Sequence, residues 1–472
     1  MFGLLDKTVY QILIACALAI ILALVTADII IPTILVILIT VVILNKEKLI
    51  LGMIILIYLT ASADLYSEYR LYLNIFNTIL LFFLFIYKYG LKFDNYQKVP
   101  REIVLFIVVL LFSLWISTVF SLKPASSALE LIRMIFFLVI CYIFYSLLDK
   151  DYKVYVYIYT LIGIMVIWGL RMVVDVYNLG VETYFVRSLL GDKSELYGRV
   201  SNTGMTVFFI SLALIVALFF NSKFKNPSEK FLLKILFGFN IIVLILANSR
   251  GGIAAALLSI AFILLVLNKS LFLKTIIIGS AITVFLIFII PGLSESVDIY
   301  LRWHTLSDRE PFWNSGLRVI ADYSLFGIGP GLFADYFYVY APSSLINYYS
   351  NPGLDIGNPH PHNIFLYYTA ENGIMGLIVA IAFFYMFFYF ALKTLKLTKN
   401  INRDYFILTT AITGIGLGLF FRSFIEITGF LTYGYITTDL PFWLVFGILI
   451  FIYQKFKKQN MEYESPRTKN LY

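Results

Sequence analysis

The sequence predicts an all-α polytopic membrane protein, and three observations lead to this prediction. Hydrophobic residues make up 61% of the chain and charged residues only 14%, against about 25% charged residues in an ordinary soluble domain. The apolar residues gather in runs of about 17 to 25, the length that a helix needs to cross a bilayer. No segment has the balanced composition of a soluble domain, so residues 1–472 are expected to form a single membrane domain.

Fourteen apolar runs qualify as membrane spans, at 10–26, 29–44, 49–65, 71–89, 101–120, 127–147, 153–174, 203–220, 231–248, 252–267, 272–291, 364–391, 405–424 and 435–454. The first run resembles a signal peptide, but a second run follows directly after Asp28, so we expect a retained hairpin and not a cleaved leader. If these two runs form a re-entrant pair instead, the number of spans is twelve. An even number places both termini on the same side of the membrane.

The positions of the basic residues predict the orientation. With a cytoplasmic N-terminus, 24 of the 36 Lys and Arg residues fall in cytoplasmic segments, as the positive-inside rule requires. We therefore expect an inner-membrane protein whose two termini, including the tail 455–472, are cytoplasmic. Segments 175–202 and 292–363 become a short and a large periplasmic loop. The net charge of +8 then reflects topology, so membrane lipids and not nucleic acid are the expected partners.

The type of cation differs between the two sides. Of the 24 cytoplasmic cations 21 are Lys, whereas ten of the other 12 are Arg. Arginine offers a planar fork that binds phosphate oxygens in pairs, so the arginines indicate a phosphorylated ligand on the outer side. The alternative is that individual arginines anchor the chain at lipid headgroups. The ten are Arg70, Arg133, Arg171, Arg187, Arg199, Arg250, Arg302, Arg309, Arg318 and Arg422.

Two short motifs place arginines at the predicted outer surface. Ser249-Arg250-Gly251-Gly252 joins two apolar runs, where Arg250 either meets a ligand or snorkels to headgroups. Asp308-Arg309-Glu310-Pro311 indicates a loop that enters a helix with proline in its first turn. Arg309 would then lie beside a helix N-terminus, a natural anion site, unless it pairs with a neighbouring carboxylate. The segment Gly327–Gly331 lacks the strand and helix of a phosphate-binding loop, so we interpret it as a structural turn.

All three histidines, His304, His360 and His362, lie in the large loop. Asn363 is a suitable N-cap for the run that follows, and the adjacent helix N-terminus keeps the ring of His362 neutral, so that it can act as a base. His360 and His362 could also be metal ligands, but the sequence offers no third ligand and we expect no metal. The acidic pair Asp308 and Glu310 supplies too few oxygens for a hard cation. Cys16 and Cys141 are expected to be small residues inside apolar runs.

These motifs, in this order, resemble the O-antigen ligase and polymerase superfamily. The resemblance covers about residues 195–450, while the N-terminal half matches only in hydropathy. It implies a bundle of the C-type glycosyltransferases with a long periplasmic loop, although fourteen spans exceed the usual twelve or so of the ligases. The matching elements are Arg199 in Tyr-Gly-Arg-Val-Ser-Asn, the Ser249-Arg250-Gly251 turn, Arg309 with Trp313, Phe326–Gly331, and His362-Asn363 followed by Glu371-Asn372-Gly373 and Gly376.

The resemblance also implies an activity. Such an enzyme, without metal or cofactor, moves a glycan from an undecaprenyl diphosphate carrier to an acceptor hydroxyl on the periplasmic face. We expect a single displacement, which inverts the configuration at the anomeric carbon. His362, Arg250 and Arg309 would be catalytic, and Arg199, Arg250 and Arg309 would bind the diphosphate.

Three alternatives for the function remain at this point. A ligase would use lipid A core as acceptor, whereas a polymerase would extend a growing O-antigen or exopolysaccharide. A flippase or transporter of the same lipid-linked sugar would need ionisable residues inside the membrane, for which Glu130 and Arg133 are the main candidates.

Overall fold

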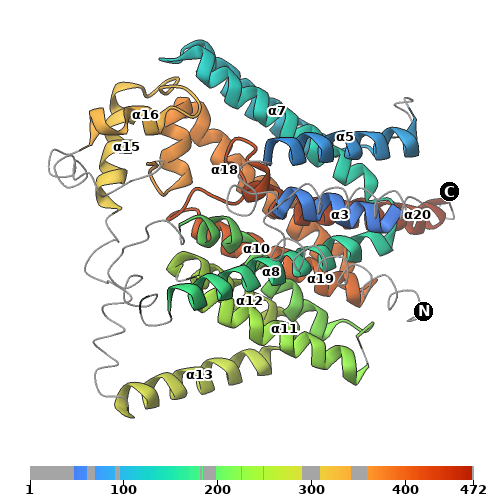
Figure 1. Ribbon diagram of the computed structural model, residues 1–472. Helices are drawn as coiled ribbons and strands as arrows, with labels where there is room; N and C mark the ends of the chain where they lie inside the picture. Colours follow the sequence, from blue (N-terminus) through green and yellow to red (C-terminus); the bar gives the residue numbers. More distant parts are fainter. Residues whose placement is uncertain are drawn as a thin grey trace.

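The chain forms a helical bundle in the computed structural model, which describes residues 47–60, 70–90, 96–180, 183, 198–224, 226–247, 249–289, 309–341 and 359–469. Within these ranges the structure has helices and no strand (Figure 1). The helices are α3 (Glu47–Thr60), α5 (Arg70–Tyr89), α6 (Arg101–Val119), α7 (Pro124–Leu147), α8 (Asp151–Leu179), α10 (Gly198–Phe220), α11 (Pro227–Leu246), α12 (Arg250–Leu267), α13 (Lys269–Ile289), α15 (Glu310–Asp322), α16 (Phe333–Tyr340), α18 (Ile364–Thr398), α19 (Arg403–Arg422) and α20 (Ile436–Lys469).

Twelve of the fourteen predicted runs coincide with one helix each, from α3 to α13 and from α18 to α20. Eight of the described helices are long and apolar enough to cross a membrane, and α10 adds the shorter apolar segment Gly204–Phe220. The prediction of an all-α polytopic membrane protein is therefore confirmed. The runs predicted at 10–26 and 29–44, with Cys16, lie outside the described residues, as do His304 and Asp308.

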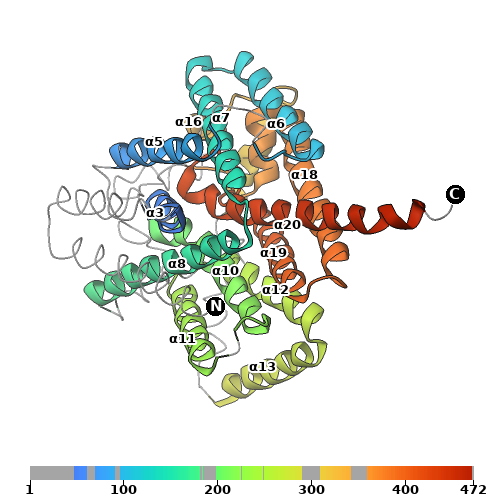
Figure 2. The same cartoon turned by 90° about the vertical axis from the view of Figure 1, so that its right-hand side faces the viewer.

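Helices α12 and α19 pack closely at the centre of the bundle because small residues line their contact. A Cβ atom added at Gly418 would lie 2.5 Å from the carbonyl oxygen of Ala255, so the two backbones approach as only glycine permits. Ser259 Oγ donates a hydrogen bond of 2.9 Å to the carbonyl oxygen of Gly414. By contrast α13 is largely exposed and lies at the edge of the bundle against α12 (Figures 1 and 2).

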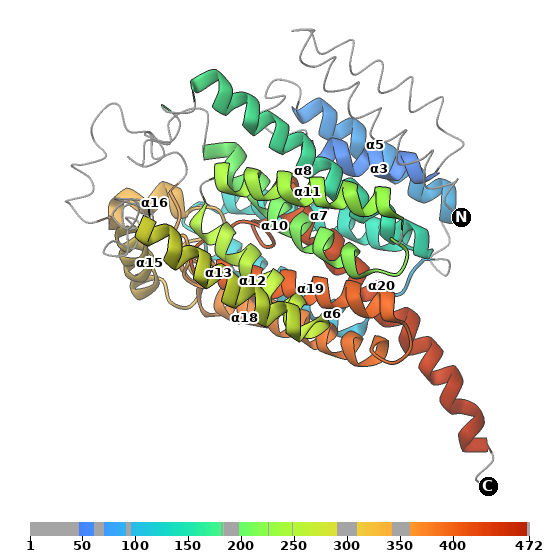
Figure 3. The ribbon, with the colours of Figure 1, turned by 90° about the horizontal axis from the view of Figure 1, so that it is seen from below.

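The helix ends that carry the predicted cytoplasmic lysines meet at one end of the bundle. Lys88 forms ion pairs with Glu47 at 2.9 Å and with Asp149 at 2.7 Å. Lys153, whose side chain is fully buried, pairs with the same two carboxylates. Helices α15 and α16 lie at the opposite end, away from the C-terminal part of α20, which projects beyond the other helices (Figures 1 and 3).

Helix α18 is broken near its start, which the sequence analysis did not predict. Gly373 has φ 63° and ψ −155° inside the helix, and a Cβ atom there would lie 2.1 Å from the carbonyl oxygen of Leu325. The break frees backbone groups that the loop between α15 and α16 satisfies. Ile328 N donates to Ala370 O at 3.1 Å, and Gly329 N donates to Glu371 O at 2.9 Å.

The glycine-rich segment 327–331 is the structural turn that its sequence predicted. Gly327, Gly329 and Gly331 all have positive φ, a backbone conformation that side chains with a Cβ atom rarely adopt. Their missing side chains also make room for α18, Ser121 and Glu130 respectively. The segment thus holds α15 and α16 against the rest of the bundle.

Candidate functional site

Several segments far apart in the sequence converge at the end of the bundle where α15 and α16 lie. The loop 359–363 before α18 is joined to the loop 423–435 between α19 and α20: Ile364 N donates to Ser423 O at 2.9 Å, and Asn363 Nδ2 donates to Phe424 O at 3.2 Å. The predicted N-cap is confirmed, since Asn363 Oδ1 accepts from Phe365 N and Leu366 N. These bonds fix the position of the residue before the cap, His362.

His362 has an unusual backbone for a non-glycine residue, with φ 47°. Such strained conformations cost of the order of 1 to 3 kcal/mol and gather at functional sites. The ring of His362 lies 4.2 Å from that of His360, centroid to centroid, and packs edge-on against Phe312 of α15. The turn therefore brings both rings to one side of the Pro359–Asn363 segment.

Both histidines face the carboxylate of Glu426, a buried residue of the loop 423–435. His360 Nε2 lies 3.3 Å from Oε1 of Glu426, and His362 Nδ1 lies 3.5 Å from Oε2. The backbone N of Ile427 donates to Oε1 at 2.9 Å. The carboxylate thus has a fixed orientation between the two rings.

The electrostatics of this group favour an ionised Glu426 carboxylate and a neutral His362 ring. Burial is the main cause that lowers the pKa of His362 to about 4; His360 and Arg309 lower it further, and Glu426 acts in the opposite direction. Burial alone would raise the pKa of Glu426, but the two histidines reverse this and hold the pKa well below its ordinary value. The sequence-based prediction of a neutral His362 agrees with these directions.

Arg309 lies at the N-terminus of α15, as the sequence predicted, and Pro311 is in the first turn. Burial lowers the pKa of Arg309, while the charge of Glu426 acts in the opposite direction, so guanidinium and carboxylate lie near each other. One turn further on, the indole Nε1 of Trp313 is buried without a hydrogen-bond partner among the described residues. Glu310 is exposed. Its predicted partner in an acidic pair, Asp308, is outside the described residues.

Arg250 is the first residue of α12, and the Ser249 side chain caps that helix by accepting from Gly252 N at 3.4 Å. A Cβ atom at Gly251 would lie 2.7 Å from Ile425 Cδ1, so this turn lies against the loop that carries Glu426. Arg199 is in the first turn of α10, and its side chain lies outside the described part of the structure. The structure therefore brings the Arg250 turn, Arg309 and His362 together around the loop 423–435.

Two residues at this site, Arg422 and Glu426, were not recognised from the sequence as site residues. Arg422, at the end of α19, is buried; its Nη1 donates to Thr206 Oγ1 at 3.0 Å and its Nη2 to Thr428 Oγ1 at 3.0 Å. The available signal was the segment Arg422-Ser-Phe-Ile-Glu426, with two charges just beyond an apolar run. Arg422 was noted only as one of the ten outer or embedded arginines.

A third potential ligand beside the two histidines was not recognised from the sequence. Glu426, 66 residues after His360, completes a group of three side chains. One donor atom from each of His360, His362 and Glu426 lies within 4.8 Å of the others. Among the described residues, this is the group with the donors and spacing that could hold a metal ion.

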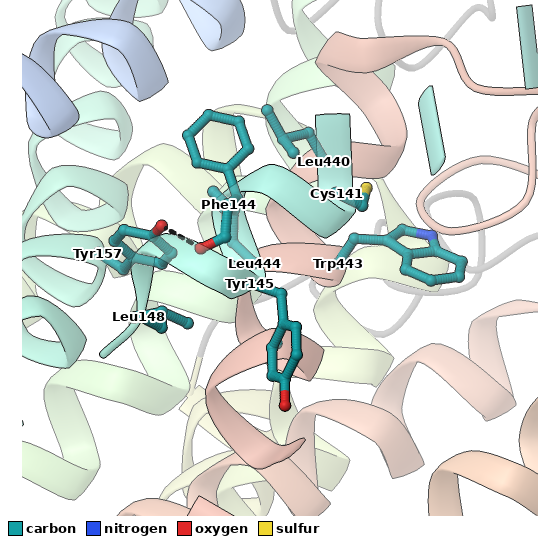
Figure 4. A pocket seen from close by; sticks show the side chains of 9 residues that line it. Cys141, Phe144, Tyr145, Leu148, Tyr157, Leu440, Trp443 and Leu444 are labelled. Atoms are coloured by element: carbon teal, nitrogen blue, oxygen red, sulfur yellow. Dashed lines mark hydrogen bonds between the residues drawn. The ribbon is translucent and has the colours of Figure 1, made fainter. Parts of the chain in front are cut away.

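Two further features do not belong to this site. Glu130 and Arg133 form a salt bridge within α7, so the embedded pair considered for a transporter is an ion pair. An apolar crevice lined by Cys141, Tyr145, Trp443 and neighbours lies between α7, α8 and α20 (Figure 4). It has no room for a water molecule and contains none of the candidate residues.

The comparisons with known proteins agree with the resemblance noted in the sequence. Residues 235–381 match the family model described as O-Antigen ligase, a range that includes Arg250, Arg309 and His362 but neither Arg199 nor Glu426. A search of curated proteins found no match for the chain. Over residues 235–381 the chain is therefore similar to the O-antigen ligase family.

Proposed function

We propose that the protein is a glycosyltransferase that moves a glycan from an undecaprenyl diphosphate carrier to an acceptor hydroxyl. The observation that carries the proposal is the convergence of the Arg250 turn, Arg309 and His362 at one end of the bundle, all within the family match. The fold is that of a C-type bundle in the bacterial inner membrane. The site opens to the periplasm, with the loop 292–363 outside and both termini, including the tail 455–472, in the cytoplasm.

The reaction is a single displacement. The acceptor oxygen attacks the anomeric carbon, the bond from that carbon to the diphosphate oxygen breaks, and the configuration at the carbon inverts. Arg250 and Arg309, with Arg199 as a helper, bind the diphosphate and stabilise the charge that it gains on leaving. Because a diphosphate is a good leaving group, the step needs neither a general acid nor a metal ion.

His362 accepts the proton of the acceptor hydroxyl. Its position supports this role, since it lies just before the N-cap of α18, beside the charge of Arg309, and is only partly buried. Glu426 faces Nδ1, so a proton on Nδ1 leaves the lone pair on Nε2 for the acceptor. The free indole N–H of Trp313 is available to a substrate oxygen at the same site.

The acceptor is either lipid A core, as for a ligase, or a growing O-antigen or exopolysaccharide chain, as for a polymerase. Lipids extracted from cells that lack the protein distinguish the two. A ligase defect leaves full-length polymer on the carrier, whereas a polymerase defect leaves single repeat units. If neither species accumulates and the lipid-linked unit is instead retained on the cytoplasmic face, the protein is a transporter and the glycosyltransferase proposal fails.

A further inference from the structure

We propose that His360, His362 and Glu426 bind a transition-metal dication such as Zn²⁺, and that the bound ion inhibits the reaction. The first half of this inference depends only on the geometry of the three side chains. The second half rests on the proposed role of His362. The two halves are therefore tested by different measurements.

The donor spacing fits a tetrahedral ion. Zn²⁺ binds imidazole nitrogen and carboxylate oxygen at about 2.0 to 2.2 Å, so two donors of one tetrahedral ion lie roughly 3.4 Å apart. The distance from His360 Nε2 to Glu426 Oε1 is 3.3 Å, and from His362 Nδ1 to Glu426 Oε2 it is 3.5 Å. All three donors lie within 4.8 Å of one another, so small side-chain rotations suffice to form the site.

The backbone holds these donors in place before any ion binds. The bonds from Ile364 N to Ser423 O and from Asn363 Nδ2 to Phe424 O tie the two loops together. Ile427 N holds one oxygen of Glu426. The positive φ of His362 turns its ring to the side of His360. A preorganised group of this kind binds an ion without ordering a loop first.

The chemistry of the donors selects the class of ion. Imidazole suits Zn²⁺, Cu²⁺, Ni²⁺ and Fe²⁺, whereas Mg²⁺ and Ca²⁺ need six or more oxygen ligands. Two neutral rings and one carboxylate neutralise half of the charge of a dication. Arg309 and Arg422 lie close enough for their charges to act on this group, so the ion is held less tightly than in a site without them, and binding is reversible.

Bound metal removes the lone pair that the reaction needs. In the proposed reaction the metal-free His362 carries its proton on Nδ1, which faces Glu426, and Nε2 can accept a proton. An ion on Nδ1 moves that proton to Nε2, because a neutral imidazole carries one N–H. Nε2 is then a donor and cannot receive the proton of the acceptor hydroxyl. His360 has no step in the proposed reaction, so its replacement separates metal binding from proton transfer.

The test uses full-length protein in nanodiscs, purified through a tag without histidine and stripped with a chelator. Titration with Co²⁺ should give the strong visible absorption of a tetrahedral site at one equivalent, and Zn²⁺ should displace it while Mg²⁺ and Ca²⁺ should not. His360→Gln should weaken Zn²⁺ binding by more than the roughly 10 to 100-fold typical of outer-shell changes. The matched control is His304→Gln, which changes the third histidine of the chain and should leave Co²⁺ binding at the wild-type level.

Transfer assays test the inhibition. Zn²⁺ should inhibit the wild-type protein, a chelator should restore its activity, and His360→Gln should remain active but lose most of its sensitivity to Zn²⁺. Equal Zn²⁺ sensitivity of wild type and His360→Gln would show that the ion acts elsewhere, for example on the diphosphate. Absence of the Co²⁺ absorption, or its survival in both His360→Gln and His360→Asn, overturns the metal site. Absence of transfer activity in stripped wild-type protein would instead contradict the proposed function and leave the binding result standing.

Discussion

The carboxylate of Glu371, in the broken part of α18, accepts a hydrogen bond of 2.8 Å from the backbone N of Gly331, 40 residues earlier in the chain. Its other oxygen, Oε1, accepts from Phe333 N at 2.8 Å. The hydroxyl of Tyr433 donates to Oε2, the same oxygen that accepts from Gly331. One buried side chain thus connects the turn after α15, the start of α16 and the loop after α19. The positions of Arg309 on α15 and of His362 before α18 depend on this connection.

We expect Glu371→Gln to destabilise the protein by about 1 to 3 kcal/mol, the cost of leaving a buried donor without its acceptor. Glutamine keeps the size of the side chain, but its NH₂ group replaces one of the two oxygens that accept hydrogen bonds from Gly331 N and Phe333 N. Unfolding in mixed micelles titrated with denaturing detergent measures the change. Glu310→Gln, at an exposed position on α15, is the control and should stay within about 0.5 kcal/mol. Equal stability of both variants would argue against the role of Glu371 as a connector.

Arg309→Lys and Arg250→Lys should each lower transfer by roughly 10² to 10³-fold, the usual effect of removing one group that stabilises transition-state charge. Lysine keeps the charge but cannot bind two phosphate oxygens with a planar fork. Transfer in membranes with equal amounts of protein measures the effect. Arg318→Lys, an exposed arginine later in α15, should retain normal transfer. Wild-type rates in both site variants would assign these arginines to headgroup anchoring.

His362→Ala should lose about 10² to 10⁴-fold in rate, which is what general-base assistance contributes, while binding of the lipid donor persists. His360→Ala should lower the rate much less, because His360 has no step in the proposed reaction. Its contact is with the carboxylate of Glu426. Rates and donor binding are measured on the same purified samples. The assignment of the base is wrong if His360→Ala proves to be the more damaging change.

A cysteine placed at Ser344 should react with an impermeant maleimide in spheroplasts, and one placed at Asn268 should not. The background is a variant in which Cys16 and Cys141 are replaced. The expectation follows from the lysine-rich helix ends, which lie at the end of the bundle opposite to α15. Labelling at Asn268 alone would reverse the orientation and place the candidate site in the cytoplasm.

Most of the fold could be predicted from the sequence because lipid imposes a simple rule. An apolar run of sufficient length must be a helix, since its backbone groups have no water to bond. The start of α18 shows how local signals add detail, because the side chain of Asn363 caps the helix as predicted. The break at Gly373 was missed, since the segment Glu371-Asn372-Gly373 does not by itself reveal that the carbonyl of Leu325 comes within contact distance.

Only those residues of the candidate site that lie next to a recognisable local motif could be predicted from the sequence. Arg309 and His362 stand next to helix starts that the sequence marks with Pro311 and Asn363. Glu426 has no such mark. It became recognisable only when hydrogen bonds between the loops 359–363 and 423–435 placed it beside His362. A carboxylate that acts through contacts 64 positions away cannot be identified from local pattern alone.

The glycine contact between α12 and α19 has a mechanical consequence. Arg250 begins α12, and Arg422 ends α19 a few residues before Glu426, so the two sides of the site stand on two helices locked backbone to backbone at Ser259 and Gly414. A thinner or thicker bilayer tilts helices to match its depth, and the exposed α13 is free to follow such a change. Helices α12 and α19 are expected to tilt together, which keeps the distance between Arg250 and Arg422 constant when the lipid chain length changes.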